Sequence, residues 1–166
     1  MKKLYLVRHA KSSWDDLDMR DFDRPLNERG EKDAPRMAKK LRDKDITPDR
    51  MISSPAVRAL TTCQAFAAVL GFDKHKIITV EELYHASMDT WLKVLKRLPE
   101  HNDNEDIAFI FGHNPGITEF ANALLDVNID NIPTCGVVSA TLKIKTWRDA
   151  AWGCGHLDAF DYPKKD

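Results

Sequence analysis

IAFIF (residues 107–111) is an uninterrupted apolar run between Asp106 and Gly112, and it is the clearest strand signal in the chain. A short apolar run with such boundaries is typical of a strand that is buried on both faces. Similar but weaker runs predict further strands at Leu4–Val7, Arg50–Ile52, Lys76–Val80, Val137–Ile144 and Leu157–Phe160. We therefore expect a sheet of about six short strands.

Amphipathic stretches separate most of these strands. Apolar residues recur at helical spacing over residues 34–41, 56–70, 88–98 and 117–124. Pro35 is expected to kink the first helix or to mark its start. Strands that alternate with helices predict an α/β fold, and we expect a three-layer α/β/α sandwich around a mostly parallel sheet. No helix separates the last two strands, so the sheet is expected to be mixed at one edge.

The composition is that of a folded globular chain. The 166 residues are 43% hydrophobic and 31% charged, which predicts a single domain over residues 1–166. The net charge of −1 provides no bulk attraction to nucleic acid or to anionic lipid. No stretch approaches the roughly 20 apolar residues of a membrane span, and the apolar run after Lys3 is too short for a signal peptide.

The three cysteines are an odd number, and none stands in a C-x-x-C pair. This pattern argues against a disulfide framework and against a thiolate zinc site. We therefore expect a cytoplasmic protein without a metal or another cofactor.

Polar side chains follow three of the predicted strands. Arg8 and His9 end the first strand, Arg58 stands one turn into the helix after the second, and His113 follows residues 107–111. Because ligands of open α/β sheets bind outside the carboxyl ends of the strands, we expect these four side chains to converge.

Two of these strand ends also resemble helix starts. Ser54 and Asn114 are expected to be N-caps, and each is followed by a proline at the first helical position. Two helix N-termini would then direct their free N–H groups at the same place. Together with two arginines and two histidines, they predict an anion pocket, most simply one for a phosphoryl group.

His9 is the predicted nucleophile of this pocket. Imidazole has an ordinary pKa near 6.5, so much of it is unprotonated at neutral pH and able to attack phosphorus. One ring nitrogen would attack while the other donates to a fixed acceptor such as a backbone carbonyl. Arg8, Arg58 and His113 would bind the phosphoryl oxygens and offset charge in the transition state.

Leu6-Val7-Arg8-His9-Ala10 resembles the signature of the histidine phosphatase superfamily, also called phosphoglycerate mutase-like, with Ala10 in place of the usual glycine. Three further segments are similar to the SixA-type phosphohistidine phosphatases of that superfamily: RPLNERG at 24–30, SSPAVRA at 53–59 and GHNP at 112–115. The resemblance extends from residue 3 to about residue 125. It implies a phosphoglycerate mutase-like fold, a phosphorylated His9 intermediate, and a phosphate pocket of Arg8, Arg58 and His113.

The resemblance also implies a carboxylate proton donor shortly after the third strand. That region contains Glu82 and His85, and the donor position falls nearer His85. A phosphate ester needs a general acid for its leaving group, whereas phosphohistidine releases a neutral imidazole once it is protonated. A weak or missing carboxylate therefore favours phosphohistidine on a protein over a sugar phosphate.

The sequence thus predicts a metal-independent phosphatase of signal transduction that acts on a phosphorylated protein and needs neither nucleic acid nor a membrane. The modest length leaves little room for a cap over the pocket, which suits a side chain presented by a protein. Two alternatives remain: a phosphomonoesterase for a small sugar phosphate, and a phosphate-binding module without turnover.

The loop of residues 15–23 is acidic, and it would either repel polyanions or simply be solvated. Arg24, which follows this loop, would either reach the site or pair with Asp21 or Asp23.

Overall fold

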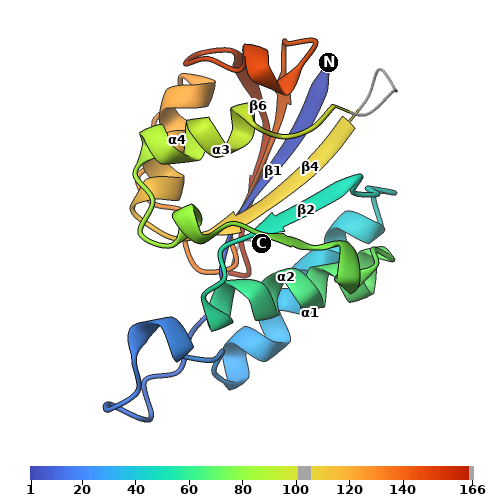
Figure 1. Ribbon diagram of the computed structural model, residues 1–166. Helices are drawn as coiled ribbons and strands as arrows, with labels where there is room; N and C mark the ends of the chain where they lie inside the picture. Colours follow the sequence, from blue (N-terminus) through green and yellow to red (C-terminus); the bar gives the residue numbers. More distant parts are fainter. Residues whose placement is uncertain (101–105, 165–166) are drawn as a thin grey trace.

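The computed structural model describes residues 1–100 and 106–164, and six strands in it form one sheet in the order β3-β2-β4-β1-β5-β6 (Figure 1). The strands are β1 (Lys2–Arg8), β2 (Arg50–Ser53), β3 (Ile78–Thr79), β4 (Asp106–Gly112), β5 (Val137–Leu142) and β6 (Gly155–Asp161). Strands β1, β2, β3 and β4 are parallel to one another, while β5 is antiparallel to both of its neighbours, β1 and β6. The predicted mixed edge is therefore confirmed.

Helices cover both faces of this sheet. Helices α1 (Glu28–Arg42) and α2 (Val57–Leu70) pack on one face, and α3 (Met88–Lys96) and α4 (Gly116–Leu125) pack on the other (Figure 1). Alternate residues of β1 enter the two cores: Leu4 and Leu6 contact the α3–α4 side, and Tyr5 and Val7 contact the α1–α2 side. This period-2 alternation produces the predicted three-layer α/β/α sandwich. Within the described residues, none of the helices has the length and apolarity needed to cross a membrane.

Two element boundaries differ from those that the sequence predicts. Helix α1 begins at Glu28, where the Asn27 side chain accepts a hydrogen bond from the Gly30 N–H, so Pro35 lies inside the helix and does not mark its start. Strand β3 has two residues instead of five, because Lys74–Lys76 forms a short 3-10 turn that Asp73 caps.

A buried ionic cluster joins three strands at the end of the sheet opposite to His9. The fully buried Asp106 accepts hydrogen bonds from the Arg50 guanidinium and from the indole N–H of Trp147. The Lys2 ammonium is 2.8 Å from Glu100 and 3.8 Å from Asp106. Since Lys2, Arg50 and Asp106 begin β1, β2 and β4, the cluster fixes the relative register of the strands whose other ends form the site.

Candidate functional site

The carboxyl ends of β1, β2 and β4 surround a cavity of about 250 Å³. Arg8 is the last residue of β1, Arg58 lies in the first turn of α2, and His113 follows β4 directly. The structure brings these three residues and His9 to one cavity, with the His9 and His113 ring centroids 5.2 Å apart. The cavity is also lined by Lys11, Ser12, Trp14, Asp21, Asn114 and Thr134.

The hydrogen bonding of His9 determines which of its nitrogens is free. His9 Nδ1 lies 2.8 Å from the carbonyl oxygen of Ala10, and because a carbonyl oxygen only accepts, Nδ1 must be the donor. The neutral ring therefore has its lone pair on Nε2. Burial lowers the pKa of His9 to about 4; the Ala10 hydrogen bond opposes this shift, and the charges of Arg58 and Arg8 reinforce it. At neutral pH the ring is an uncharged base with one available nitrogen.

Backbone hydrogen bonds from two neighbouring segments hold the Arg8–His9 peptide. The His9 N–H donates to the Gly112 carbonyl at 3.1 Å. The Cys135 N–H is shared between the carbonyl oxygens of Arg8 and His9, at 3.1 and 3.0 Å. Cys135 has a φ of 60°, in the left-handed region, which turns its N–H toward both acceptors. His9 thus sits on a backbone that β4 and the loop before β5 both fix.

Thr62 connects the residue after His9 with helix α2. The Thr62 hydroxyl accepts from the Ala10 N–H at 3.0 Å and donates to the Arg58 carbonyl at 2.7 Å. Ala10, which replaces the glycine of the superfamily signature, is fully buried, so its methyl group fills space in the core. The relative position of His9 and Arg58 is therefore set by buried hydrogen bonds.

Asp21 is a cavity residue that the sequence did not single out. Arg58 donates to the Asp21 carbonyl oxygen at 2.7 Å and to its carboxylate at 2.9 Å, and the Tyr84 hydroxyl donates to the same carboxylate oxygen at 2.7 Å. Partial burial opposes ionisation of Asp21, but these hydrogen bonds outweigh it and keep its pKa below the ordinary value. No spacing distinguishes Asp21 from the other aspartates of residues 15–23.

Arg8 and His113 each present a buried nitrogen that lacks a hydrogen-bond partner. Arg8 donates from Nη1 to the Ile132 carbonyl, but its Nε has no acceptor. The Nε2 atom of His113 is 2.8 Å from the Ser54 hydroxyl, while its Nδ1 is unpartnered. Burial, with smaller contributions from the neighbouring His9 and Arg58, lowers the pKa of His113 to about 3. The buried Arg8 Nε is an unpaired donor, which is unfavourable, and the guanidinium charges of Arg8 and Arg58 at the cavity would attract an oxygen-rich anion.

The predicted N-caps are wrong in both cases. Helix α2 begins at Val57 and α4 at Gly116, so each starts later than Ser54 or Asn114 would place it. The Ser54 hydroxyl instead forms a hydrogen bond with His113 and accepts from the Ala56 N–H, while the side-chain amide oxygen Oδ1 of Asn114 accepts from the Thr118 hydroxyl. The two side chains order the cavity wall, and they do not cap the helices.

The structure separates the two candidate proton donors. Glu82 is exposed and forms a bidentate pair with Arg97 at 3.0 Å, beside a different cavity near β3. It does not line the cavity of His9, so the expectation that it could serve as the donor is corrected. His85 lies nearer: its ring centroid is 3.9 Å from that of Tyr84, and it lines an adjoining cavity of about 320 Å³ together with His113.

Arg24 follows neither of its two predicted alternatives. Its guanidinium lies 3.9 Å above the Trp14 ring and donates to the Asp16 carbonyl oxygen at 3.0 Å. Asp23 pairs with Arg20 instead, and Asp21 with Arg58. Arg24 therefore shapes the loop that precedes α1.

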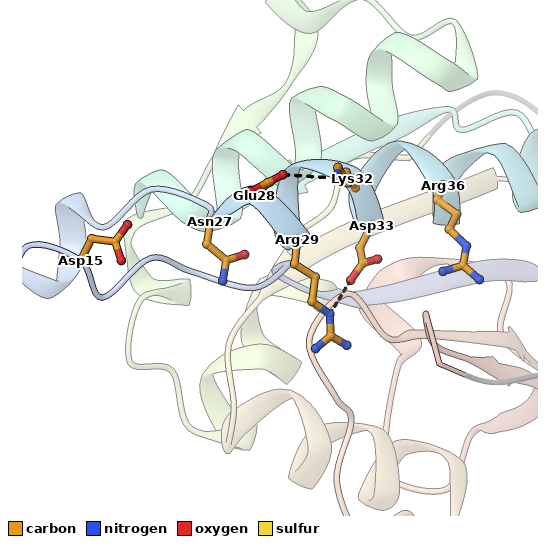
Figure 2. Close-up of a pocket in the computed structure, with 7 residues that line it drawn as sticks. All are labelled: Asp15, Asn27, Glu28, Arg29, Lys32, Asp33 and Arg36. Carbon is orange, nitrogen blue, oxygen red and sulfur yellow. Dashed lines mark hydrogen bonds and ion pairs between the residues drawn. The ribbon is translucent and has the colours of Figure 1, made fainter.

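A larger cavity, of about 680 Å³, runs along α1 away from His9 (Figure 2). None of the four predicted site residues lines it. Figure 2 shows Arg29, Asp33 and Arg36 on one side of the helix, with an ion pair of 3.4 Å between Arg29 and Asp33.

Comparison with known proteins gives the context of this geometry. The family model of the histidine phosphatase superfamily, branch 1, matches residues 4–94. The chain belongs to this superfamily. A chloroplastic protein of Arabidopsis thaliana, described as uncharacterized, is 34% identical over 154 residues, covering 90% of this chain and 70% of the relative. The superfamily assignment made from the sequence motifs is thus confirmed.

Solved structures of this superfamily share the fold. A protein assigned as the phosphohistidine phosphatase SixA of Agrobacterium tumefaciens is 29% identical, with a TM-score of 0.79 and 97% of each chain covered. A protein histidine phosphatase SixA in complex with tungstate is 20% identical, with a TM-score of 0.80 and 96% of each chain covered. The phosphoserine phosphatase of Entamoeba histolytica, bound to 3-phosphoglyceric acid, is 19% identical, with a TM-score of 0.69, over 99% of this chain and 98% of that one. The last two similarities establish the phosphoglycerate mutase-like fold alone.

Proposed function

We propose that this chain is a phosphohistidine phosphatase in which His9 accepts the phosphoryl group from a phosphorylated protein. The observation that supports this most directly is the hydrogen bond from His9 Nδ1 to the Ala10 carbonyl, which leaves Nε2 as the nucleophile. Arg8, Arg58 and His113 line the same cavity and would bind the phosphoryl oxygens.

In the first step, the lone pair of His9 Nε2 forms a bond to phosphorus while the P–N bond of the substrate breaks. The bonding electrons return to the substrate imidazole, which leaves as a neutral ring because its other nitrogen is already protonated. The phosphorylated His9 ring keeps its proton on Nδ1, which still donates to the Ala10 carbonyl, and the ring is therefore a cation. In the second step, water attacks phosphorus, the electrons of the P–Nε2 bond return to His9, and the proton of the water leaves with inorganic phosphate or to solvent.

The acid–base properties of the cavity favour this substrate class. An ester leaving group would need a general acid with a pKa near the working pH. Among the cavity residues Asp21 is the only carboxylic acid, and its hydrogen bonds from Arg58 and Tyr84 keep its pKa low, so it is a poor proton donor. A protonated phosphohistidine brings its own proton and does not depend on such a group.

A single histidine phosphatase domain would extend over residues 1–166, without a metal requirement. Three cysteines outside any C-x-x-C pair agree with a reducing cytoplasm, and removal of phosphate from a histidine would give the protein a role in signal transduction.

The test is phosphate release, in the presence of EDTA, from free phosphohistidine, from a histidine-phosphorylated protein and from p-nitrophenyl phosphate. We expect the wild type to prefer both P–N substrates and His9→Ala to lose at least about a thousandfold in rate. His75→Ala removes an exposed histidine outside the cavity and serves as the matched control. Rapid quenching should trap an acid-labile, alkali-stable phosphoryl group on the wild type and not on His9→Ala.

Other results would select an alternative. Hydrolysis of the ester alone would indicate a small-molecule phosphomonoesterase and would direct the search for a proton donor to His85. A stable phosphoryl group on His9 without release would indicate a phosphate-binding module. Loss of activity with EDTA would contradict the metal-independent mechanism.

A further inference from the structure

The loop between β1 and α1 presents apolar side chains to solvent directly beside the cavity. Among residues 1–100 and 106–164, five large apolar side chains are exposed, and two of them, Trp14 and Leu17, lie in this loop. Trp14 is 57% exposed and Leu17 is 80% exposed. Trp14 also lines the cavity that contains His9, so the exposed apolar surface adjoins the reacting group.

The loop has a fixed shape despite this exposure. Its ends are joined by the Ser12–Leu26 bridge and by a hydrogen bond from the Ser13 N–H to the Pro25 carbonyl. At the tip, Asp16 accepts from the N–H groups of Asp18 and Met19, which forms the turn that holds Leu17 outward. In Figure 1 this segment projects from the body of the molecule at the lower left. Leu17 is thus presented on an ordered turn.

The guanidinium of Arg24 packs against one face of the Trp14 indole ring. The buried guanidinium lies 3.9 Å from the centre of the indole ring and donates a hydrogen bond to the Asp16 carbonyl oxygen. Because the guanidinium occupies that side, the indole ring cannot pack against the loop there. An exposed indole whose position is restricted in this way provides a large rigid contact surface at little cost in conformational entropy. Trp has this role at the centres of protein interfaces.

The aspartates that flank Trp14 and Leu17 indicate what charge a binding partner would carry. Asp15, Asp16 and Asp18 are exposed and flank Trp14 and Leu17 in the chain. The surface therefore favours apolar side chains accompanied by Lys or Arg and disfavours polyanions.

The cavity along α1 does not extend this acidic surface. Its charged residues are of both signs, and the Asp33 carboxylate is paired with Arg29 at 3.4 Å (Figure 2). The acidic surface beside Trp14 and Leu17 is therefore that of the loop itself.

We propose that Trp14 and Leu17, with their aspartate neighbours, form the docking surface for the protein substrate, and that they select phosphohistidine flanked by apolar and basic residues. This inference rests on the proposed function, because it assigns the protein part of that substrate. Apolar contact with Trp14 and Leu17 would hold the partner while its phosphorylated side chain enters the cavity.

The experiment compares two synthetic phosphohistidine peptides of equal length, one flanked by Leu and Lys and the other by Ser and Glu, with free phosphohistidine as the small substrate. For the wild type we expect kcat/KM to be about tenfold higher for the Leu/Lys peptide, with the difference in KM. Leu17→Ser should reduce kcat/KM for the Leu/Lys peptide about fivefold and leave free phosphohistidine unchanged. Ile78→Ser, which removes an exposed apolar side chain on β3, is the matched control and should change neither rate.

A second variant tests the charge contribution. Asp15→Asn combined with Asp16→Asn keeps the side-chain acceptor of the turn but removes two charges, and it should weaken the preference for Lys over Glu. Equal kcat/KM for both peptides, or an unchanged peptide preference in Leu17→Ser, would overturn the docking surface while hydrolysis of free phosphohistidine still supports the proposed function. If the wild type hydrolyses neither the peptides nor free phosphohistidine, both proposals fail.

Discussion

Lowering the pH from 7 to 4 should destabilise the folded protein through His9, because this ring is buried in its neutral form. In the unfolded chain His9 takes up a proton near its ordinary pKa of 6.5, whereas in the folded protein it does so only near pH 4. Between these two values the unfolded state binds more protons, so the free energy of unfolding decreases as the pH falls. A pKa difference of this size corresponds to ~3 kcal/mol at pH 4.

The measurement is urea-induced unfolding, followed by tryptophan fluorescence, at several values between pH 7 and pH 4. His9→Asn is the informative variant, since its side-chain amide can still donate to the Ala10 carbonyl but does not titrate. The wild type should lose ~3 kcal/mol more than His9→Asn over this interval. His75→Asn, which removes an exposed histidine, should behave as the wild type does. Equal losses in the wild type and in His9→Asn would refute the argument that burial controls the protonation of His9.

Three further substitutions test how the fold positions the site. Thr62→Val leaves the Ala10 N–H without its acceptor, so unfolding should become easier by about 1–3 kcal/mol and kcat/KM should fall, as denaturation and a phosphate-release assay would show. Gly30→Ala would place a Cβ atom about 2.3 Å from the carbonyl oxygen of Lys11, and this backbone contact should destabilise the protein by about 1–3 kcal/mol; a thermal melt identical to that of the wild type would contradict it. Asp106→Ala leaves the buried Arg50 guanidinium unpaired and should cost about 3–5 kcal/mol, whereas a loss below 1 kcal/mol in chemical denaturation would show that the cluster contributes little.

Much of the candidate site could be predicted because the topology of a parallel sheet gathers strand ends. Arg8, His9 and His113 directly follow buried apolar runs, and such runs are strong local signals. Arg58 stands one turn into the helix that follows the second strand, so the same argument included it, and the superfamily motifs agreed. These predictions needed no knowledge of side-chain contacts.

Asp21 and the two helix starts could not be predicted, because they depend on tertiary contacts. The aspartates of residues 15–23 look equivalent in sequence, and only the folded chain brings Asp21 between Arg58 and Tyr84. Likewise, Ser54 has the sequence context of an N-cap, yet its hydroxyl is used by His113. Local capping preferences of about 1 kcal/mol are readily overridden by such contacts.

Pro35 and Glu82 are two further residues for which local sequence did not predict the structure. A proline inside a helix removes one hydrogen bond, but α1 starts from a well-formed Asn27 cap and continues through it. Glu82 lies close to the expected donor position in the chain, but its pairing with Arg97 keeps it on the surface beside α3. The position of Glu82 in the sequence therefore did not show whether its side chain lines the cavity of His9.

The position of Cys135 has a consequence for resistance to oxidation. Its N–H donates to the Arg8 and His9 carbonyl oxygens, so Cys135 helps to position His9 through its backbone, while burial raises the pKa of its thiol. The same holds for the buried thiol of Cys63, and oxidants attack thiolates far more readily than thiols. If His9 is the nucleophile, as we propose, and these two thiols stay protonated, the protein should keep its activity in hydrogen peroxide under conditions that inactivate enzymes with a catalytic thiolate.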